Sequence, residues 1–467
     1  MNLPWDAIWH TAVGIGYIVF ATWATGHALL NKRDPRAAFG WIGLCWLMPF
    51  AGAAIYSVFG INRVEARGRR LQGLSQRRPR ELPGHFDDLP LIQLQRIGGA
   101  VSGLPLLGGN RLQPLRDASH AYPQMLEAIA AARQTIWLES YIFDTSGPSR
   151  RFFEALVAAV KRGVVVKVLI DGFGEWYSLP HPVARLRRRG IDAARFLPPR
   201  LLPPSLSVNL RNHRKTLIVD GLVGFTGGMN ISNVYLARRR RKRTADTHFR
   251  VDGPVVVQLA AAFARDWAFA TREKLPLAVP PERVGNARAR VIGGGPDEDL
   301  DKLVLVLLGA VSAAHRSIHI MTPYFLPPRE LAAALQAAAL RGVDVEVILP
   351  YHSNLRYVDW AARHAMRYLL EYGVRIYFSP KPFDHSKLLM VDGVYSLVGS
   401  ANLDPRSLRL NFELGVEVFD PGLCAQLETV FEQARARSNP VDPIAHNLRA
   451  LPVRLRDSVF WLFSPYL

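Results

Sequence analysis

The sequence predicts an α/β protein that consists of two similar repeats preceded by a membrane-spanning helical hairpin. Three observations lead to this prediction: two long charge-free segments near the N-terminus, a pair of matching motifs far apart in the chain, and an alternation of apolar strands with alanine-rich helices. The charge balance fits a membrane location, because 58 Lys and Arg against 39 Asp and Glu give a formal net charge of +19. That sign favours polyanionic partners, either nucleic acid or an anionic membrane surface.

Two segments near the N-terminus, residues 8–30 and residues 37–59, contain no Asp, Glu, Lys or Arg. At a rise of ~1.5 Å per residue each predicts a helix of about 34 Å, long enough for a hydrocarbon core of ~30 Å. Trp9 and Tyr56 stand near the segment ends, where amphipathic aromatic rings prefer to lie. We therefore expect a transmembrane hairpin over residues 1–60.

Basic residues flank these segments unequally. The larger cluster follows the second segment, and the positive-inside rule then predicts that the C-terminal part and the N-terminus both face the cytoplasm. The absence of a basic residue before the first segment opposes this orientation. The basic residues are Lys32, Arg33 and Arg36 in the joining loop, and Arg63, Arg67, Arg69, Arg70, Arg77, Arg78 and Arg80 after the second segment.

The polar and reactive residues inside the hairpin have simple interpretations. His27 is interpreted as a packing residue and not as part of a proton path. Cys45 is expected to be a small buried apolar residue, and together with Cys424 it forms neither a metal-ligand pattern nor a disulfide framework.

An internal repeat underlies the remaining chain. Residues 213–220 read HRKTLIVD and residues 385–392 read HSKLLMVD, so an offset of 172 superimposes a His-x-Lys-x4-Asp pattern on itself. One such match would be weak, but two matches at a single offset are a strong signal. The same offset relates Gly227 to Gly399 and Asn230 to Asn402.

Each motif follows a strand–helix–strand pattern. Alanine-rich segments that end in glycine read as helices, and β-branched runs such as VVVKVLI and VDVEVIL read as strands. This alternation predicts two pseudo-symmetric α/β/α sandwich repeats, each with a largely parallel sheet. The expected divisions are a hairpin over 1–60, a basic linker over 61–108, a first repeat over 109–272, a proline-rich linker over 273–295, a second repeat over 296–440 and an amphipathic C-terminal segment over 441–467.

The motif spacing predicts a shared reaction centre. Because side chains two residues apart in a strand point the same way, His213 lies on one face with Lys215, and His385 with Lys387. Pseudo-twofold packing of the repeats would bring two imidazoles and two ammonium groups together, which suits a phosphodiester substrate. One histidine would attack phosphorus and the other would protonate the leaving alkoxide, with no metal or other cofactor.

Further residues are expected to support this chemistry. Asn230 and Asn402 would help the lysines to hold the non-bridging phosphate oxygens. Asp246 and Glu413, each just before an apolar strand, are candidates for orienting the imidazoles, although ordinary strand-end charges remain an equal alternative.

The aspartates that complete the two motifs are treated with the catalytic set. Asp220 and Asp392 are each followed by glycine, which is typical of turns. We interpret them as structural more than catalytic.

The paired motifs resemble the two HKD motifs of the phospholipase D superfamily. With the apolar hairpin, GNRLQPLRD (109–117) and LESYIFD (138–144), the chain is similar over nearly its whole length to the bacterial cardiolipin synthases. The resemblance implies transfer of a phosphatidyl group between two phosphatidylglycerols in the bacterial inner membrane, with His213 as nucleophile. It implies anionic phospholipids, including cardiolipin, as partners and no nucleic acid. Arg406 is then a candidate for binding the phosphate of the acceptor lipid, with a structural role as the alternative.

Several alternatives stay open at this stage. A hydrolase on the same scaffold would release phosphatidic acid, or cleave DNA, although two apolar spans and the lack of an aromatic–basic module argue against a nuclease. A non-catalytic scaffold is disfavoured by the intact motifs. The basic run over 238–243 is either a solvated loop or a contact for anionic headgroups. The C-terminal sequence RLRDSVFWLFSPYL either lies on the membrane surface or packs on the second repeat.

Overall fold

The computed structural model describes residues 5–31, 35–48, 50–60, 89–199, 210–237, 243–276, 279–297 and 299–464. The chain forms two compact units, and the larger one holds both repeats. The smaller unit comprises Met1–Gly73 and Arg200–Ser207, and the larger comprises Leu74–Pro199 and Val208–Leu467.

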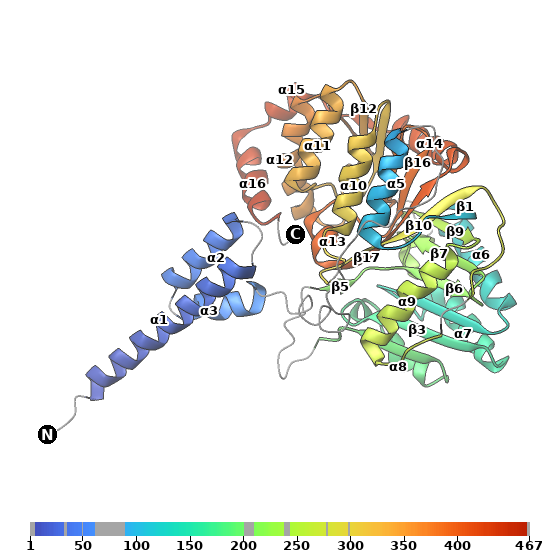
Figure 1. Ribbon diagram of the computed structural model, residues 1–467, viewed down its shortest axis with the longest axis horizontal. Coiled ribbons are helices and arrows are strands. Elements are labelled where there is room, and N and C mark those ends of the chain that lie inside the picture. The colour runs from blue at the N-terminus through green and yellow to red at the C-terminus, as the bar shows by residue number, and fades with distance from the viewer. Residues whose placement is uncertain are drawn as a thin grey trace. The chain divides into compact units, whose positions relative to one another are not determined.

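A long apolar helix dominates the smaller unit (Figure 1). Helix α1 covers Trp5–Asn31, and its stretch Ile8–Leu30 is long and apolar enough to cross a membrane. Its side chains Ile15 and Val19 are each 58% exposed, which is typical of a surface that faces lipid and not water. The first predicted span is confirmed as a continuous helix.

The second apolar segment is not the single 23-residue helix that the sequence suggested. It divides into α2 (Pro35–Leu47), α3 (Ala51–Ile55) and the π-helical turn η1 (Tyr56–Gly60). Pro49 has no N–H to donate and disfavours a helical residue before it, so α2 ends just before it in sequence. Phe50, with a φ of 57°, then starts α3 in a new direction. Among the described residues only α1 has the length of a membrane span.

The helices of the smaller unit pack through polar and small side chains. The ring nitrogen Nδ1 of His27 lies 2.8 Å from the Tyr56 hydroxyl, and Trp46 Nε1 donates to Thr25 Oγ1 at 3.0 Å. Cys45 is buried, as expected. His27 is thus a packing residue. The basic flanks assigned to Lys32, Arg33 and the cluster from Arg63 to Arg80 lie outside the described residues, as does the side chain of Arg36.

The larger unit contains two copies of one order of elements. The first copy comprises β1 (Leu107–Arg116), α6 (Ala118–Ala131), β2 (Thr135–Ser140), α7 (Arg150–Lys161), β3 (Val165–Asp171), α8 (Pro182–Arg187), β4 (Asp192–Phe196), β5 (Arg211–Asn212), β6 (Thr216–Val219), β7 (Val223–Gly227), β8 (Thr244–Ala245), β9 (Thr247–Asp252) and α9 (Val256–Thr271). The second comprises β10 (Ala287–Gly294), α10 (Lys302–Ala313), β11 (Ser317–Met321), α11 (Arg329–Leu340), β12 (Asp344–Pro350), α12 (Arg356–Glu371), β13 (Arg375–Ser379), β14 (Phe383–Asp384), β15 (Leu388–Val391), β16 (Tyr395–Gly399), α13 (Pro405–Arg409), β17 (Asn411–Phe419) and α14 (Pro421–Arg435).

The strand order confirms the internal repeat. One continuous sheet runs β18-β13-β12-β11-β15-β16-β17-β10-β1-β9-β7-β6-β2-β3-β4, where β18 is Asn439–Pro440. Counted outward from the β10–β1 pair, equivalent strands of the two copies occupy equivalent positions on the two sides of this junction. The two copies are therefore related by a pseudo-twofold axis at the antiparallel β1–β10 junction.

The sheet is mixed, and the expectation of a largely parallel sheet is wrong. Parallel pairing is confined to β2–β3–β4, β11–β12–β13 and the short β5–β17 pair within the described part of this sheet. The motif strands β6 and β15 pair antiparallel to β2 and β11, and each continues through a tight hairpin into β7 or β16. The Asp-Gly dipeptides at these turns are typical of antiparallel hairpins, because their positive φ values suit a tight turn.

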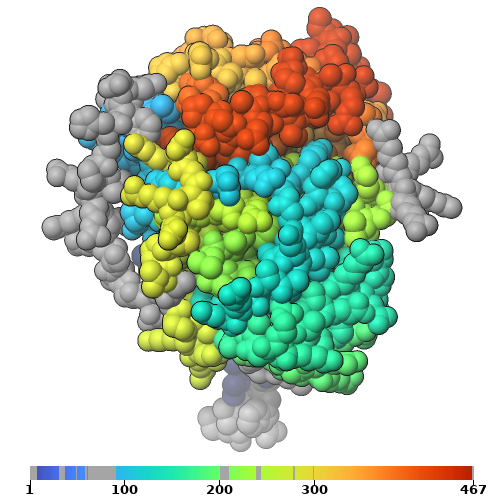
Figure 2. Space-filling view, turned by 90° about the vertical axis from the view of Figure 1, so that its right-hand side faces the viewer, coloured from blue at the N-terminus to red at the C-terminus, as the bar shows by residue number. Residues whose placement is uncertain are grey.

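Helices cover both faces of the sheet, as predicted for α/β/α layers. In the first copy α6 and α7 share one apolar core, while Trp137 of β2 stacks on Phe263 of α9 across the other face at 5.5 Å. In the second copy α10, α11 and α12 contribute to one core, and α14 contacts the opposite side. Figure 2 shows the first copy in teal and green against the second in orange and red.

Two segments that were predicted to be linkers contain ordered elements. Residues 61–108 include helix α5 (Leu89–Ser102), which packs on α10, and residues 273–295 include the whole of β10. Residues 61–88 lie outside the described residues.

Candidate active site

The two motif histidines sit just before strands β6 and β15, where the two repeats interlock. The two-residue strand β5 pairs with the start of β17, and β14 pairs with β8, so each motif is bonded to the other repeat. The His213 N–H donates to the carbonyl of Phe412 at 2.8 Å, and the His385 N–H donates to that of Ala245 at 2.7 Å. Backbone pairing thus brings the two predicted histidines into one site.

Each imidazole is held by a carboxylate from the opposite repeat. His213 Nδ1 lies 3.0 Å from Glu413 Oε1, and His385 Nδ1 lies 3.0 Å from Asp246 Oδ2. Both carboxylates are fully buried at the position where β17 or β9 begins. The geometry matches the expected orienting contacts, and it leaves Nε2 of each ring for a substrate.

The two carboxylates differ in protonation. Burial raises the pKa of Asp246 to about 8 against the opposing charge of Lys387. The pKa of Glu413 is lowered, because His213, Lys215 and a hydrogen bond from Ser400 outweigh the effect of its burial. The residue equivalent to Ser400 in the first repeat is Gly228, which has no hydroxyl to donate, and this explains part of the difference.

The histidines themselves are held in the neutral form. Burial and the nearby lysines lower the pKa of His213 despite its contact with Glu413. The pKa of His385 is lowered further, by burial and then by Lys387 and His213. A phosphodiester anion entering the site would oppose these effects and raise the pKa of both rings.

The two motif lysines lie beside the histidines. Lys215 Nζ donates to the carbonyl of His213, and Lys387 Nζ donates to that of His385 and lies 2.9 Å from its Nδ1. Burial lowers the pKa of Lys215 to about 7 and that of Lys387 to about 8. Both amines are therefore close to losing their charge in the empty site, and an anionic ligand would restore it.

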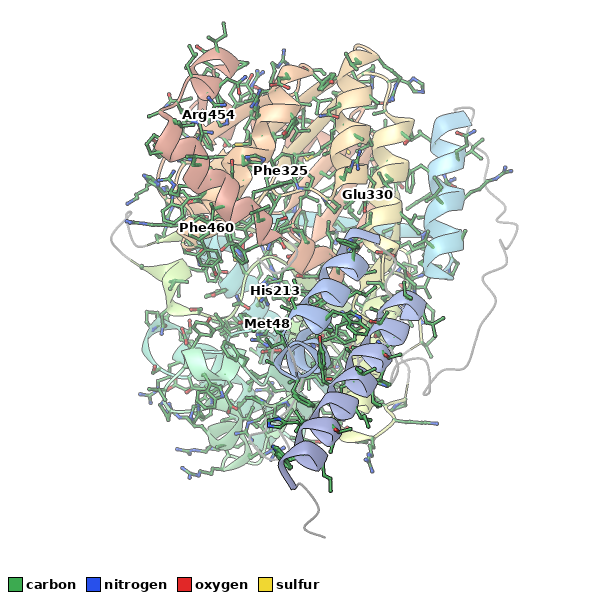
Figure 3. The ribbon with its side chains drawn as sticks, turned by 90° about the vertical axis from the view of Figure 1, so that its left-hand side faces the viewer. Met48, His213, Phe325, Glu330, Arg454 and Phe460 are labelled. Carbon is green, nitrogen blue, oxygen red and sulfur yellow. The ribbon has the colours of Figure 1, made fainter. Side chains whose placement is uncertain are left out.

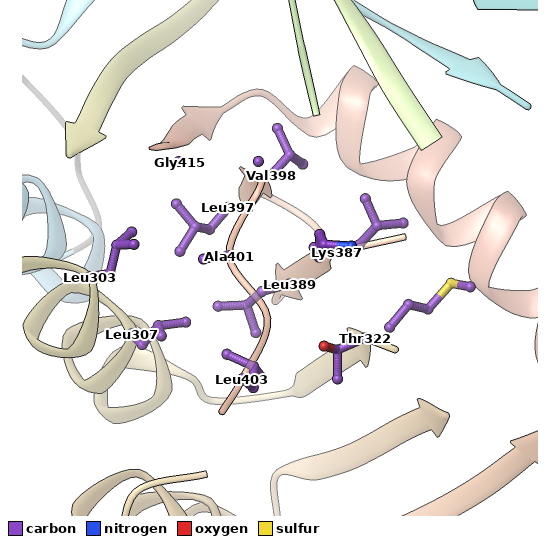
Figure 4. A pocket seen from close by; sticks show the side chains of 13 residues that line it. Leu303, Leu307, Thr322, Lys387, Leu389, Leu397, Val398, Ala401, Leu403 and Gly415 are labelled. Carbon is purple, nitrogen blue, oxygen red and sulfur yellow. The ribbon is translucent and has the colours of Figure 1, made fainter. Parts of the chain in front are cut away.

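An apolar pocket behind Lys387 contributes to this burial (Figure 4). Its volume is about 40 Å³, and its lining includes Leu389, Leu397 and Leu403. Because its walls are almost entirely apolar, the pocket is a packing defect beside the charged cluster and not a place for phosphate.

The two motif asparagines are both buried but have different contacts. Asn230 Oδ1 accepts from the Ile142 N–H at 3.1 Å, and Asn402 Nδ2 donates to Ser407 Oγ at 3.1 Å. Asn402 Oδ1 has no hydrogen-bond partner among the described residues. Their roles toward phosphate stay predictions.

Asp220 and Asp392 lie outside this cluster, at the other end of strands β6 and β15. Asp220 accepts from three consecutive backbone N–H groups, those of Arg133, Gln134 and Thr135, at 2.8 to 2.9 Å. Asp392 accepts from residues 315–317 in the same way. Each aspartate thus ties a hairpin to the start of β2 or β11, and a catalytic role for either one stays a prediction.

Arg406 lies on α13 at the edge of the site, partly buried, and a second arginine that sequence reasoning missed lies near it. Burial and the like charge of Arg211 lower the pKa of Arg406, which also interacts with Tyr141 and Tyr357. The Tyr141 ring makes an edge-on contact with His213 at 5.4 Å. Arg211 lies two residues before His213 in the sequence, but only the folded chain brings it near Arg406.

Two predicted surface segments are only partly described. Residues 238–242 of the basic run lie outside the described residues, while Arg243 Nη2 lies 3.3 Å from Asp117 Oδ2. At the C-terminus residues 465–467 also lie outside. Among the described residues no group of three or more His, Cys, Asp or Glu side chains is arranged to hold a metal ion.

Comparison with known proteins agrees with this site. The family described as "Cardiolipin synthase, PLD-like domain" matches residues 125–267 and 307–435, and "Phospholipase_D-nuclease N-terminal" matches residues 19–60. A cardiolipin synthase of Geobacillus sp. (strain WCH70) is 31% identical, with 94% of this chain and 90% of the relative covered. Cardiolipin synthase A of Pseudomonas aeruginosa (strain LESB58) is 33% identical, with 92% and 90% covered.

A solved structure supports the fold alone. The phosphatidylserine synthase of Haemophilus influenzae Rd KW20 superimposes with a TM-score of 0.62 at 17% identity, over 80% of this chain and 100% of that one.

Proposed function

The chain belongs to the family of cardiolipin synthases with phospholipase D-like domains, and from this premise we propose that it transfers a phosphatidyl group from one phosphatidylglycerol to another. The products are cardiolipin and glycerol. The observation that carries the proposal is the pair of imidazoles in one site, each oriented by a carboxylate of the opposite repeat and each beside a lysine. This arrangement supplies one imidazole as the nucleophile and the other as the acid and then the base.

In the first step His213 Nε2 attacks phosphorus of the donor lipid. The P–N bond forms while the P–O bond to glycerol breaks, and His385 gives its proton to the leaving oxygen. In the second step a hydroxyl of the acceptor gives its proton to His385 and attacks phosphorus. The P–N bond then breaks, so both histidines return to their starting state.

The lysines and asparagines would hold the phosphoryl oxygens through both steps. Lys215 and Lys387 carry positive charge in a buried site, where its effect on developing negative charge is strong. This is the contribution that metal ions make in many phosphoryl-transfer enzymes, so the proposed mechanism needs no metal. Asn230 and Asn402 would donate to the same oxygens.

His385 needs a proton before it can act as an acid. Its pKa is held well below the usual value in the empty site, by burial first and then by Lys387. The bound phosphodiester brings a negative charge that favours the imidazolium ion, and Asp246 beside it stabilises the same charge once its carboxyl group ionises. Substrate binding would therefore prepare the acid.

Arg406 and Arg211 are proposed to bind the phosphate of the acceptor lipid. Two guanidinium groups that repel each other at the edge of a buried site favour the binding of a monoanionic phosphodiester between them. Water, at ~55 M, competes for the same phosphohistidine, but oriented reactants reach effective molarities of about 10⁵ M or more. Where water wins, the product is phosphatidic acid.

The reaction would take place at a bacterial inner membrane. Helix α1 supports membrane association, and the basic residues that follow the apolar segments support a cytoplasmic site. Anionic phospholipids are the proposed partners. We attribute the protein's net positive charge to binding of these lipids and not of nucleic acid.

Expression in a bacterial host that lacks its own cardiolipin synthases tests the proposal. We expect cardiolipin to appear in the lipid extract with the wild-type chain and not with His213→Ala. Matched protein levels in the membrane fraction are the control. An unchanged lipid extract with correctly inserted wild-type protein would contradict the proposal.

A further inference from the structure

The C-terminal helix α16 (Leu451–Leu462) packs against α12 with only one of its faces. The Phe460 ring lies 4.8 Å from Trp360, and Trp461 lies 4.6 Å from His364. Ser458 Oγ hydrogen-bonds His364 Nδ1 at 2.9 Å. The sequence left open whether this segment lies on the membrane surface or packs on the second repeat. Both are compatible, because packing uses only one side of α16.

The opposite face of α16 is apolar and exposed. Leu451, Leu455, Val459 and Leu462 follow the spacing of one helix face, and they are 63%, 57%, 51% and 68% exposed. Ile444 and Leu448, on the preceding helix α15 (Pro443–Asn447) and its end, are exposed as well. We call the face of Leu451, Leu455, Val459 and Leu462 the outer face of α16.

The charged residues of the helix are turned away from this outer face. Asp457 is buried, and its carboxylate accepts from Arg449 at 2.6 Å and from Arg456 at 2.7 Å. Arg454 is exposed at the border of the face (Figure 3). A helix in water shows the reverse pattern, with charges outward and apolar residues inward, so the outer face indicates a partner that is apolar and bordered by negative charge.

The inner side of α16 packs on the segment of α12 that leads to Arg406, and we call the edge of the site marked by Arg406 and Arg211 its mouth. Trp360, which Phe460 covers, lies in the first turns of α12, three residues after Tyr357, and Tyr357 interacts with Arg406. On the first repeat, Trp176 and Tyr177 are 66% and 63% exposed in the turn η3 (Gly174–Tyr177).

This turn also lies beside the site. The Tyr177 ring lies 6.1 Å from Tyr141, which in turn contacts His213. The turn η3 on the first repeat and helix α12 beneath α16 on the second are thus both linked to the active site through neighbouring aromatic side chains.

We propose that the outer face of α16 docks onto the surface of an anionic phospholipid bilayer, with Trp176 and Tyr177 inserted beside the opposite edge of the mouth. Leucine and valine side chains would enter the boundary between headgroups and acyl chains by ~5–10 Å, while Arg454 meets anionic headgroups. The net charge of +19 favours such a surface. The choice of a lipid partner rests on the proposed function, in which both substrates are lipids. Docking would place the mouth of the site at the bilayer surface, where diacyl substrates lie.

Site-directed spin labelling of the full-length protein in vesicles of phosphatidylglycerol and phosphatidylethanolamine measures this docking without turnover. With the buried Cys45 and Cys424 replaced by alanine, a nitroxide at Val459→Cys should be relaxed more by oxygen than by a water-soluble nickel chelate. Leu340→Cys is the matched control, because Leu340 is apolar and 69% exposed at the end of α11. A nitroxide there should respond mainly to nickel.

Two outcomes at Val459 would overturn the proposal. A response to nickel equal to that at Leu340 would mean that the outer face stays in water and α1 alone anchors the protein. Protection from both reagents would mean that protein covers the face, as in contact with a second copy of the chain. A label in lipid without any cardiolipin synthesis would leave docking in place and reject the proposed function instead.

Kinetics give a second test. The double variant Leu455→Glu, Val459→Glu should lose about tenfold in turnover on vesicles, because burial of these side chains no longer favours docking, yet keep wild-type turnover in detergent micelles. Leu340→Glu should be unaffected on both. Equal loss of the double variant on vesicles and micelles would show damage to the fold and contradict the docking role.

Discussion

His213 and Glu413 are separated by 200 positions in the chain, yet the Nδ1 atom of the histidine lies 3.0 Å from Oε1 of the glutamate. The reciprocal pair, His385 with Asp246, spans the two repeats in the opposite direction. Neither repeat therefore holds a complete histidine–carboxylate pair of its own. Both must fold and interlock through β5–β17 and β14–β8 before either imidazole is oriented.

The crossed carboxylates should matter for turnover more than for folding. Glu413→Gln keeps an acceptor for the imidazole N–H but removes the charge that stabilises the imidazolium ion, so kcat should fall by about 10². Initial rates with phosphatidylglycerol in mixed micelles measure this. Glu428→Gln is the matched control, because Glu428 holds His319 Nδ1 at 2.6 Å outside the site. Equal rates for Glu413→Gln and Glu428→Gln would remove the orienting role.

Only one histidine should carry the covalent intermediate. His213→Ala and His385→Ala should each nearly abolish turnover, because each side chain performs an indispensable step in both half-reactions. Reactions quenched in denaturant at alkaline pH, with donor labelled in its phosphate, should give a phosphohistidine at His213, identified by mass spectrometry of peptides. An adduct formed at normal yield in His213→Ala would reassign the nucleophile to His385.

The dependence of kcat/KM on pH should report the lysines. Their pKa values of about 7 for Lys215 and about 8 for Lys387 are lowered by burial, so their charge is present below these values and is lost above them. We expect kcat/KM to decline as pH rises through 7 to 8, and kcat to decline only at higher pH, because bound phosphate stabilises the charged amines.

The titration of Asp246 lies in the same pH range, because its pKa is about 8, but its ionisation favours the His385 imidazolium. The variant Lys215→Arg separates the titration of Lys215 from that of Asp246. Arginine stays charged, so the declining limb of the profile should move to higher pH. A limb that stays in place would assign it to another group.

The two repeats and their shared reaction centre could be predicted from the sequence because they rest on local patterns. The offset of 172 relates both motifs, and the spacing of His213 and Lys215 fixes their common face. The sequence also indicated the carboxylates Asp246 and Glu413, but not that each contacts the histidine of the opposite repeat. That arrangement depends on two-residue strands such as β5 and β14, which are too short to show an alternation of apolar and polar residues.

Other features depended on context that hydrophobicity alone does not record. The apolar segment 37–59 has the composition of a span, yet Pro49 and the positive φ of Phe50 interrupt it. The antiparallel pairing of β6 with β7 was signalled by the Asp220-Gly221 turn, which favours a hairpin over a parallel crossover. Arg211 was missed because only the folded chain brings it near Arg406.

The arginines should control which acceptor reaches the intermediate. Arg406→Ala and Arg211→Ala should each raise the ratio of phosphatidic acid to cardiolipin more than they lower consumption of donor, because water needs no phosphate contact. Timed reactions analysed by mass spectrometry give both quantities. Arg409→Ala is the control, since Arg409 lies on the same short helix and pairs with Glu330. A variant ratio equal to that of Arg409→Ala would leave Arg406 and Arg211 a structural role only.

The central claim is transfer between two lipids through one active site, and the products of the purified full-length protein test it most directly. Phosphatidylglycerol with a deuterated glycerol headgroup is mixed with unlabelled phosphatidylglycerol in detergent micelles, and cardiolipin, glycerol and phosphatidic acid are quantified. We predict cardiolipin as the main product, one free glycerol for each cardiolipin formed, and deuterated and unlabelled glycerol released in the ratio of the two donors. Phosphatidic acid as the main product, with glycerophospholipid acceptors in excess, would contradict transfer and make the protein a phospholipase D-type hydrolase.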